Sequence, residues 1–514
     1  MASSNLSSVG FGYLRIAVVG CSHGELDAIY AAAHAAGSAS SDSRPVDLVI
    51  CCGDFQAVRN GGDLACMACP PKYRAMHSFW QLYSGLATAP IPTLFIGGNH
   101  EASNHSSELP WGGWAARRVW FMGSAGVIHF GGLRIGGVSG IYKSTDFKSG
   151  YYEKAPYAGS TETHSAGHQR AFDFWRLGAL AGAPPGPLDI FISHDWPEGV
   201  YRYGDTESLV RNKPFFRADI LRGALGSPPS AALLACLKPR FWFAGHLHTK
   251  FAALVPHADG SSTRFLALDK PVPGRAFLQV LDVPRSSAAP DASFGPLTFG
   301  YDPLWMTVAV KAHAATPTMR RAPPLPSTLP LPTVREISQV AAALAANSAR
   351  SRGADAGAVK AAAQNAAAAP LAPIAVPDNF TVCAPLHDPQ YNGSGVGAPL
   401  PLQQGNPQMD QLLGVLGLPH IITVPWGGGG GDVCVGGGAS LIAQSMLSMP
   451  MPVRPDSGVA AAELRALHSA AAAAFAAVAA WGPGTGTTSA AAAEVAVAVA
   501  VTSLDANEIN LNDI

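Results

Sequence analysis

The sequence predicts an α/β fold, a sandwich of two sheets flanked by helices, in the N-terminal half of the chain. Three observations support this fold class. Short apolar runs that end in Gly, Ser or Cys-Gly recur at intervals, which is typical of buried strands that end in loops. Helical stretches lie between several of these runs. Other apolar runs have little helical pattern around them, and they indicate a second, partly antiparallel sheet.

The individual elements can be assigned in chain order. Strands are expected at 14–19, 47–51, 93–96, 189–192 and 241–244, and helices at 25–36, 72–83, 168–180 and 230–237. The first of these helices carries acidic residues in its first turn, which favours a helix start there. We assign the runs 133–138, 264–268 and 277–283 to the second sheet.

The composition excludes several classes of protein. The chain has 34 basic and 35 acidic residues, and only 13% of its residues are charged, against roughly 25% in an ordinary soluble protein. A polybasic arm or an acidic tail is therefore not its main feature. The eight cysteines are scattered and no secretory signal precedes the fold, which favours a reducing compartment. Its apolar runs are shorter than the roughly 20 residues that span a membrane, so we expect a soluble protein with no membrane partner.

The chain changes character near residue 284. Up to that point it holds twelve of the 16 histidines, and beyond it tracts of Ala, Pro and Gly alternate. Such tracts lack the large side chains that offset the entropy of ordering. We therefore expect a catalytic domain at 14–283 and a small C-terminal domain at 284–418. A poorly ordered, low-complexity insertion at about 316–376 interrupts that second domain, and a disordered low-complexity tail covers 419–514.

Metal-ligand residue types cluster at the ends of the predicted strands. Five strand ends carry seven such side chains: Cys21, His23, Asp54, Asn99, His194, His246 and His248. Open α/β sheets bind ligands at the carboxyl ends of their strands, so loops remote in sequence can meet in one crevice. Seven ligands suffice for two metals, and Asp54 is the carboxylate among them that could bridge the pair.

The motifs around these residues resemble a known family. They read GCSHGELDAIY (20–30), LVICCGDFQAVRN (48–60), LFIGGNHEASNHSSELPWGGW (94–114), FISHDWP (191–197) and FWFAGHLHTKFAAL (241–254). The ligand pattern is similar to that of the calcineurin-like metallophosphoesterase superfamily, and the longer strings resemble its lariat RNA debranching family. The resemblance implies a metallophosphoesterase sandwich of two mixed β-sheets over 14–283.

The resemblance also implies how the ligands divide. Cys21, His23, Asp54 and His248 would hold one metal, and Asp54, Asn99, His194 and His246 the other. Most of the superfamily has Asp where this chain has Cys21. A thiolate favours Zn(II) or Fe(II) over Mg(II), with Mn(II) as a substitute in vitro.

The reaction implied is hydrolysis of the 2′–5′ phosphodiester at the branch point of excised intron lariat RNA. A hydroxide that bridges the metals would attack phosphorus, and His100 would protonate the leaving 2′-oxygen as general acid. Glu101 or Asp195 could orient His100 or His194, and the sequence leaves that choice open. Such an enzyme serves RNA splicing and intron turnover, so the substrate implies a nuclear location. Splicing-related protein partners of the C-terminal region are a further expectation.

Substrate recognition is expected from a loop at about 139–170. In the family a recognition loop follows the third motif, and here it holds interleaved cations and rings, which suit phosphates and unpaired bases. Lys154 is a further cation in this loop, and Tyr151 and Tyr152 are further aromatic rings. The stretch 161–167 departs from the family pattern. The predicted RNA contacts are Tyr142, Lys143, Lys148, Tyr157 and Arg170.

Other readings stay open from the sequence alone. The chain could be a metallophosphoesterase of broader specificity, a nuclease or a phosphatase, or a scaffold that has lost its metals. Trp111 and Trp114 could line an RNA path or simply pack in the core. For Cys66 and Cys69 we expect buried or surface thiols, because no second Cys pair lies at a zinc-finger distance.

Overall fold

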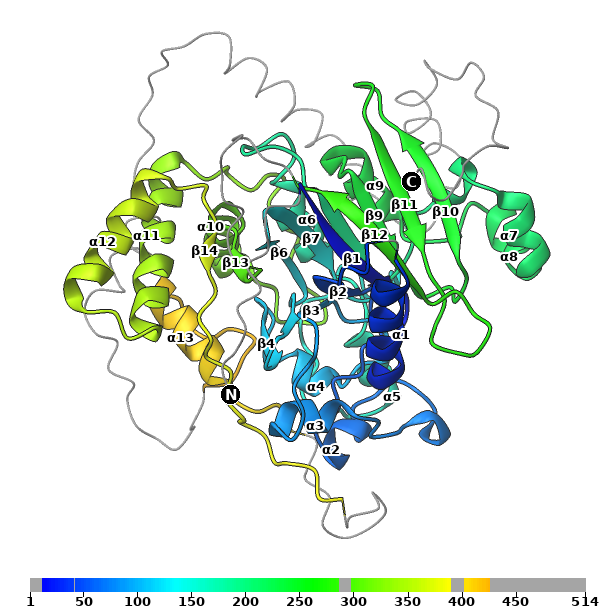
Figure 1. The fold of residues 1–514 in the computed structure, drawn as a ribbon, viewed down its shortest axis with the longest axis horizontal. Helices are drawn as coiled ribbons and strands as arrows, with labels where there is room; N and C mark the ends of the chain where they lie inside the picture. Colours follow the sequence, from blue (N-terminus) through cyan, green and yellow to red (C-terminus); the bar gives the residue numbers. More distant parts are fainter. Residues whose placement is uncertain (1–11, 41, 286–296, 390–401, 426–514) are drawn as a thin grey trace.

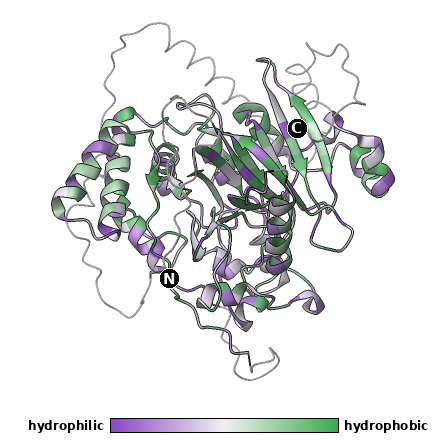
Figure 2. Cartoon of the chain, viewed as in Figure 1, coloured by the Kyte–Doolittle hydropathy of each residue, from purple (hydrophilic) through white to green (hydrophobic). Residues whose placement is uncertain are grey.

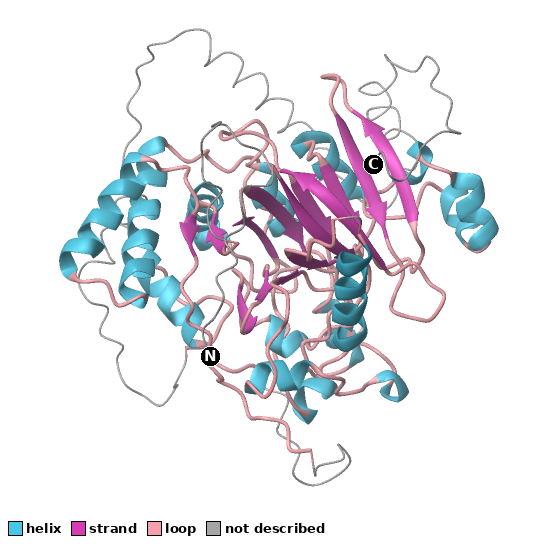
Figure 3. Cartoon of the chain, viewed as in Figure 1, coloured by secondary structure: helices cyan, strands magenta, loops and turns pink. Residues whose placement is uncertain are grey.

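The computed structural model describes residues 12–40, 42–285, 297–389 and 402–425 of the chain (Figure 1). Two sheets occupy the centre of the described part, with helices around them (Figure 3). The strands of both sheets are rich in apolar residues (Figure 2), and their buried side chains belong to one continuous hydrophobic core. The predicted α/β sandwich of two mixed sheets is therefore confirmed.

The first sheet has six strands in the order β12-β1-β2-β3-β5-β4. The bounds are β1 (Tyr13–Val19), β2 (Leu48–Cys51), β3 (Thr93–Phe95), β4 (Gly113–Ala116), β5 (Val119–Phe121) and β12 (Leu278–Pro284). Strands β1, β2 and β3 run parallel, and their register aligns Val19 with Cys51 and Cys51 with Phe95. Their carboxyl ends therefore lie level at one edge of the sheet.

The second sheet has eight strands in the order β10-β11-β9-β8-β7-β6-β13-β14. The bounds are β6 (Ala125–Phe130), β7 (Leu133–Val138), β8 (Ile190–Ser193), β9 (Phe241–Ala244), β10 (Phe251–Pro256), β11 (Ser262–Ala267), β13 (Phe299–Tyr301) and β14 (Ile374–Ala375). Strands β7, β8 and β9 are parallel neighbours, with Val138 opposite Ser193 and Ile192 opposite Phe243. Their carboxyl ends are level as well.

Helices cover the sheets and fill the loops. The longer ones are α1 (Leu26–Ala39), α6 (Ala171–Gly178), α9 (Pro228–Leu237), α10 (Pro303–Ala312), α11 (Val334–Ser351), α12 (Ala356–Ala368) and α13 (Pro407–Leu416). The short ones are α2 (Gly61–Ala65), α3 (Phe79–Ser84), α4 (Ser103–Ser106), α5 (Ser160–Ser165), α7 (Thr206–Asn212) and α8 (Phe216–Leu221), with 3-10 turns at Pro71–Tyr73, Val200–Tyr203 and His313–Ala315. Helix α1 contacts β12, and α6 contacts both β6 and α9. Within the described ranges, no helix is long and apolar enough to cross a membrane.

Two details of the predicted architecture are wrong. The run 277–283 forms β12, which pairs antiparallel with β1 in the first sheet, while β8 and β9 belong to the second sheet. An apolar run indicates that a strand is buried, but burial alone does not determine which strand it pairs with. The helix expected at 72–83 is restricted to Phe79–Ser84, with a 3-10 turn at Pro71–Tyr73 before it. Proline at the start of that turn fixes a short, separate element.

The poor order expected at 316–376 is also wrong for much of that segment, because α11 and α12 lie within it and pack against each other. Alanine is the best helix former, so an Ala-rich tract with a defined start need not be disordered. Thr333 and Glu336 form a capping box at the first turn of α11. Ile337, Val340 and Leu344 then give this helix a buried apolar face.

The C-terminal segment continues the second sheet. Strand β13 pairs antiparallel with β6 and with β14, and α13 contacts both α11 and β4. The domain boundary at 283/284 stays a prediction. The tail predicted at 419–514 lies outside the described residues from 426 onward, as does any partner site within it.

Candidate metal centre

Loops from both sheets meet at one place. The loops after β1, β2 and β3 leave the first sheet at its level edge, and those after β8 and β9 leave the second. The edges touch: the Cys52 carbonyl after β2 accepts a hydrogen bond from His194 Nδ1 after β8, at 2.7 Å. The site is therefore shared between the two sheets, which explains why its residues span positions 21 to 248.

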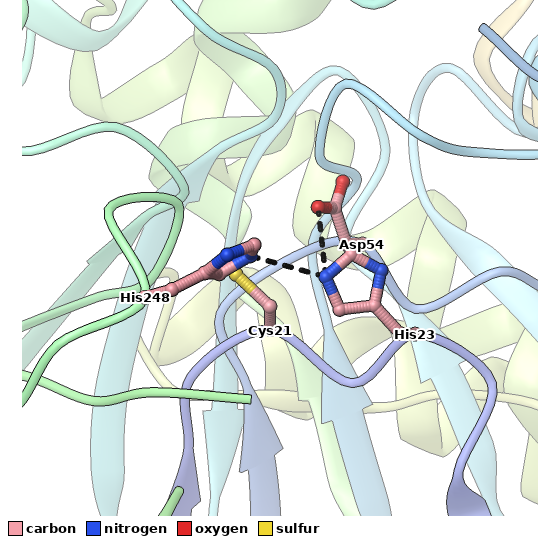
Figure 4. Close-up of side chains that lie close together, drawn as sticks. All are labelled: Cys21, His23, Asp54 and His248. Carbon is pink, nitrogen blue, oxygen red and sulfur yellow. Dashed lines mark hydrogen bonds and ion pairs between the residues drawn. The ribbon is translucent and has the colours of Figure 1, made fainter. Parts of the chain in front are cut away.

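Four of the seven predicted ligands form a tight group. The potential ligand atoms of Cys21, His23, Asp54 and His248 all lie within 4.8 Å of one another, and the side chains point toward a common centre (Figure 4). The Nε2 atoms of His23 and His248 are 3.1 Å apart, and His23 Nε2 is 3.7 Å from Asp54 Oδ2. One thiol, two imidazoles and one carboxylate around a single point are a donor set that suits a transition metal.

The remaining predicted ligands gather on the other side of Asp54. His194 Nε2 lies 3.2 Å from Asn99 Oδ1 and 3.4 Å from Asp54 Oδ1. The ring of His246 packs beside that of His194, with 5.1 Å between centroids. Asp54 therefore turns one oxygen toward each group, an arrangement in which one carboxylate can bridge two metal ions.

The backbone at these loops is unusual. His23, Asp54, His246 and His248 all have positive φ angles, between 46° and 63°. Non-glycine residues in this region are uncommon, and such strain persists where the surrounding structure fixes it, often at functional sites. Here the four residues in this conformation are all predicted metal ligands.

Electrostatics leave most of the imidazoles neutral. Burial lowers the pKa of His23 to about 4 and that of His248 to about 3, and it lowers the pKa of His246 as well. Burial alone would raise the pKa of Asp54, but the facing imidazoles, His194 first, hold it well below its usual range. Neutral imidazole and ionised carboxylate are the forms that bind metals.

The Cys21 thiol is in the opposite state. Burial and then the Asp54 charge raise its pKa well above that of a free cysteine. Its sulfur accepts a hydrogen bond from the His246 backbone N–H at 3.0 Å. Binding of a metal at Cys21 would therefore have to release a proton.

Backbone carbonyls orient the key imidazoles. His100 Nδ1 lies 3.1 Å from the Ala68 carbonyl, and His194 Nδ1 uses the Cys52 carbonyl. These contacts place the N–H on Nδ1 and leave each Nε2 to face the site. Neither carboxylate that the sequence offered for this task performs it. Glu101 accepts from the backbone N–H groups of Phe55, Gln56 and Gly98, and Asp195 from those of Tyr142 and Trp196.

His100 lies beside both ligand groups. Its backbone N–H donates to Asp54 Oδ1 at 2.9 Å, its Nε2 accepts from Asn99 Nδ2 at 3.0 Å, and its ring centroid is 6.2 Å from that of His23. The side chain is half-buried. Its Nε2 is thus within reach of a molecule held over the centre. The carbonyls of Ala68 and Cys52 have no signature in a sequence, because any residue supplies one.

The predicted recognition loop begins after β7 and returns to the metal site. Gly167 packs so closely on Asn99 that a Cβ there would lie 3.0 Å from the Asn99 Cα, and the Tyr157 hydroxyl donates to Ser103 at 2.8 Å. Lys143 and Lys148 are exposed. Tyr142 is half-buried against Phe147. The loop therefore contacts the site through Gly167 and Tyr157, and it exposes two cations.

Arg170 does not belong to that surface, and its predicted RNA contact is wrong. Its side chain is only 2% exposed. The guanidinium forms an ion pair with Glu153 and donates to the carbonyls of Ser165 and Gly150. Arg170 thus holds the loop together from inside. The sequence does not show that Arg170 is buried, because the burial of an arginine depends on the partners that the fold places around it.

The contacts of Trp111 and Trp114 favour a packing role over an RNA path. Trp114 donates to the Pro377 carbonyl and its ring packs on Trp120, while Trp111 contacts His313. These rings attach the C-terminal segment to the core. Cys66 and Cys69 are free thiols, the first of them buried.

Comparisons with known proteins agree with this geometry. A family model described as calcineurin-like phosphoesterase matches residues 14–250, and one described as the C-terminal domain of lariat debranching enzyme matches residues 260–421. A lariat debranching enzyme of Arabidopsis thaliana is 49% identical over 309 residues, which cover 60% of this chain and 71% of the relative. One of Homo sapiens is 49% identical over 301 residues, 57% of this chain and 53% of the relative. One of Caenorhabditis elegans is 47% identical over 304 residues and is covered to 59%.

Proposed function

Because the chain belongs to the lariat debranching enzyme family, whose catalytic fold is that of calcineurin-like phosphoesterases, we propose that it hydrolyses the 2′–5′ phosphodiester at the branch point of lariat RNA. The product would be linear intron RNA, and the nuclear location of intron turnover follows from that substrate. The matched segment spans only about half of the human relative, so activity and substrate are proposed here from the site itself.

The observation that carries the proposal is the position of Asp54. One of its oxygens lies 3.7 Å from His23 Nε2 and the other 3.4 Å from His194 Nε2. Cys21, His23 and His248 would complete one metal site, and Asn99, His194 and His246 the other. When bound, two divalent ions supply Lewis-acid activation of water and neutralise charge on the phosphate oxygens.

The choice of metals follows from Cys21. A buried thiolate ligand favours a soft ion, so we propose Fe(II) and Zn(II), with Mn(II) able to substitute. Changing Cys21 to Asp should shift the metal preference of the purified protein toward Mn(II). Unchanged metal content and metal dependence in Cys21→Asp would contradict this assignment.

His100, in its imidazolium form with a proton on Nε2 as well as on Nδ1, would supply the proton that the leaving group needs. The 2′-oxygen of the branch nucleotide departs as an alkoxide unless it is protonated, and His100 Nε2 faces the centre because the Ala68 carbonyl holds Nδ1. General acid catalysis by a positioned side chain is worth about 10²–10⁴-fold. The phosphate of the substrate would thus bind between the two groups of metal ligands, and His100 would deliver the proton to the leaving oxygen.

A competition assay tests the proposal. A branched RNA with a 2′–5′ linkage and a linear 3′–5′ RNA are supplied together, each with its own fluorescent label. We expect cleavage at the branch and little cleavage of the linear strand. Equal turnover of both would favour a nuclease of broad specificity, and absence of turnover by metal-loaded protein would favour a scaffold.

A further inference from the structure

A segment far from the recognition loop in sequence runs alongside it. The Gly150 N–H donates to the Met319 carbonyl at 2.9 Å, and the Tyr151 N–H donates to the Pro317 carbonyl at 2.8 Å. The approach is close enough that a Cβ at Gly150 would lie 2.5 Å from the carbonyl carbon of Pro317. Residues 317–319 are therefore fixed against the middle of the loop by backbone hydrogen bonds, and Arg320 and Arg321 follow directly.

This segment brings two arginines to the loop surface. Arg320 and Arg321 are both exposed. The Arg320 guanidinium carbon lies 5.7 Å from the centroid of the Tyr152 ring. An arginine side chain that stacks on an aromatic ring is held in place there. Its planar guanidinium group can stack on a base or donate hydrogen bonds to a phosphate.

The charges of the loop divide into two sets. Its acidic residues are Asp146, Glu153 and Glu162. Asp146 pairs with His168 and Glu153 with the buried Arg170, while Glu162 accepts a hydrogen bond from the Ala158 backbone N–H. The exposed cations are Lys143, Lys148 and Lys154 on the loop and Arg320 and Arg321 beside it. Within the described part of the chain, none of these five cations pairs with a carboxylate.

The same loop reaches the metal centre through Gly167, which packs on Asn99, and through Tyr157, which contacts Ser103 three residues after His100. A polyanion that lies along the loop would therefore lead directly to the site. Linear phosphate spacing, unpaired bases and strong negative charge match this strip of cations and rings better than a folded protein surface would.

We propose that Arg320 and Arg321 form an RNA-backbone binding site that extends the recognition loop and guides single-stranded RNA to the metal centre. The inference rests on the proposed function for the identity of the substrate. In this proposal two arginines of the C-terminal segment bind RNA directly, whereas Arg170 is buried and does not.

The salt dependence of binding gives the expected size of the effect. Each phosphate contact with a single strand contributes about 0.7 to the slope of log affinity against log salt. Removing the two arginine contacts should make the slope shallower by about 1.4. This corresponds to about tenfold weaker binding at about 0.15 M salt.

The test uses the full chain with Arg320→Gln and Arg321→Gln combined. Fluorescence anisotropy measures its affinity for a branched RNA with a non-hydrolysable 2′–5′ link over a range of salt concentrations. The matched control is Arg117→Gln with Arg335→Gln. Both control residues are exposed; Arg117 precedes β5 at the edge opposite the metal site, and Arg335 lies in the first turn of α11.

The inference predicts weaker binding and a lower slope in the test variant, a slope like wild type in the control, and unchanged thermal unfolding in both. A test variant that binds like wild type would overturn it, and so would an equal loss in the control. Failure of the proposed function would appear elsewhere, as equal cleavage of branched and linear RNA by the wild-type chain.

Discussion

Two adjacent glycines offer a sharp test of the position of Asp54. Gly98 lies against the carboxylate: a Cβ there would be 2.2 Å from Asp54 Oδ1 and 2.4 Å from the Asp54 backbone nitrogen. At Gly97 the nearest atoms to an added Cβ are 3.5 Å away, on Glu101 and Ser139. The variants Gly98→Ala and Gly97→Ala therefore add the same methyl group to one loop, and only the first meets the proposed bridging ligand.

The size of the effect follows from these distances. Ordinary contact requires about 3.5 Å, so Asp54 and residue 98 must separate by about 1 Å in Gly98→Ala. A misplacement of about 1 Å can reduce catalysis about 10²-fold, and overpacking costs about 1–3 kcal/mol of stability. We expect loss of bound metal and a rate reduced at least about 10²-fold in this variant. Gly97→Ala should stay near wild type.

The assay combines elemental analysis of the purified protein with single-turnover cleavage of branched RNA. Measuring metal content separately from rate distinguishes loss of the site from loss of a chemical step. Wild-type metal content and rate in Gly98→Ala would refute the bridging role of Asp54, and an equal defect in Gly97→Ala would show that the loop tolerates no side chain at all.

Three further predictions concern single residues. His100→Ala should keep both metals and lose about 10²–10⁴-fold in cleavage rate, and an unchanged rate would remove the general-acid role. Arg59→Met would remove the cation that now lies 2.9 Å from two buried carboxylates, those of Asp63 and Glu108. Urea unfolding should show a loss of about 3–5 kcal/mol, and a loss within error of zero would contradict the pairing. Burial lowers the pKa of His105 to about 3, so this residue is neutral in the folded chain, while the unfolded chain takes up a proton below about pH 6.5. Stability should therefore fall as the pH drops from about 6.5, and His105→Gln should lessen the difference in unfolding midpoint between pH 7 and pH 5; an identical difference in both proteins would contradict the assignment.

Residues whose chemistry is tied to strand ends were predictable from the sequence. Cys21, Asp54 and His194 each follow an apolar run that predicts a buried strand, and the carboxyl ends of parallel strands meet at one edge. The pairing of strands was less accessible. β12 joins β1 across more than 250 residues, and such contacts are set by the whole fold.

Residues defined by their partners could not be predicted in this way. Arg170 reads as a surface cation until Glu153 and the Ser165 carbonyl enclose it. Arg320 and Arg321 read as an isolated basic pair until backbone hydrogen bonds place them beside the loop. The Ala-rich helices α11 and α12 show the same limit, because their order depends on a cap and on a buried face as well as on composition.

In the proposed function, side chains from both sheets hold a pair of metal ions at which a branched RNA is opened. Anomalous diffraction at the iron and zinc edges, from crystals of the full chain with a non-hydrolysable branched RNA, tests it most directly. We expect two peaks about 3.5–4 Å apart, with Asp54 between them and Cys21 beside one of them. A single peak, or peaks remote from Asp54, would contradict it.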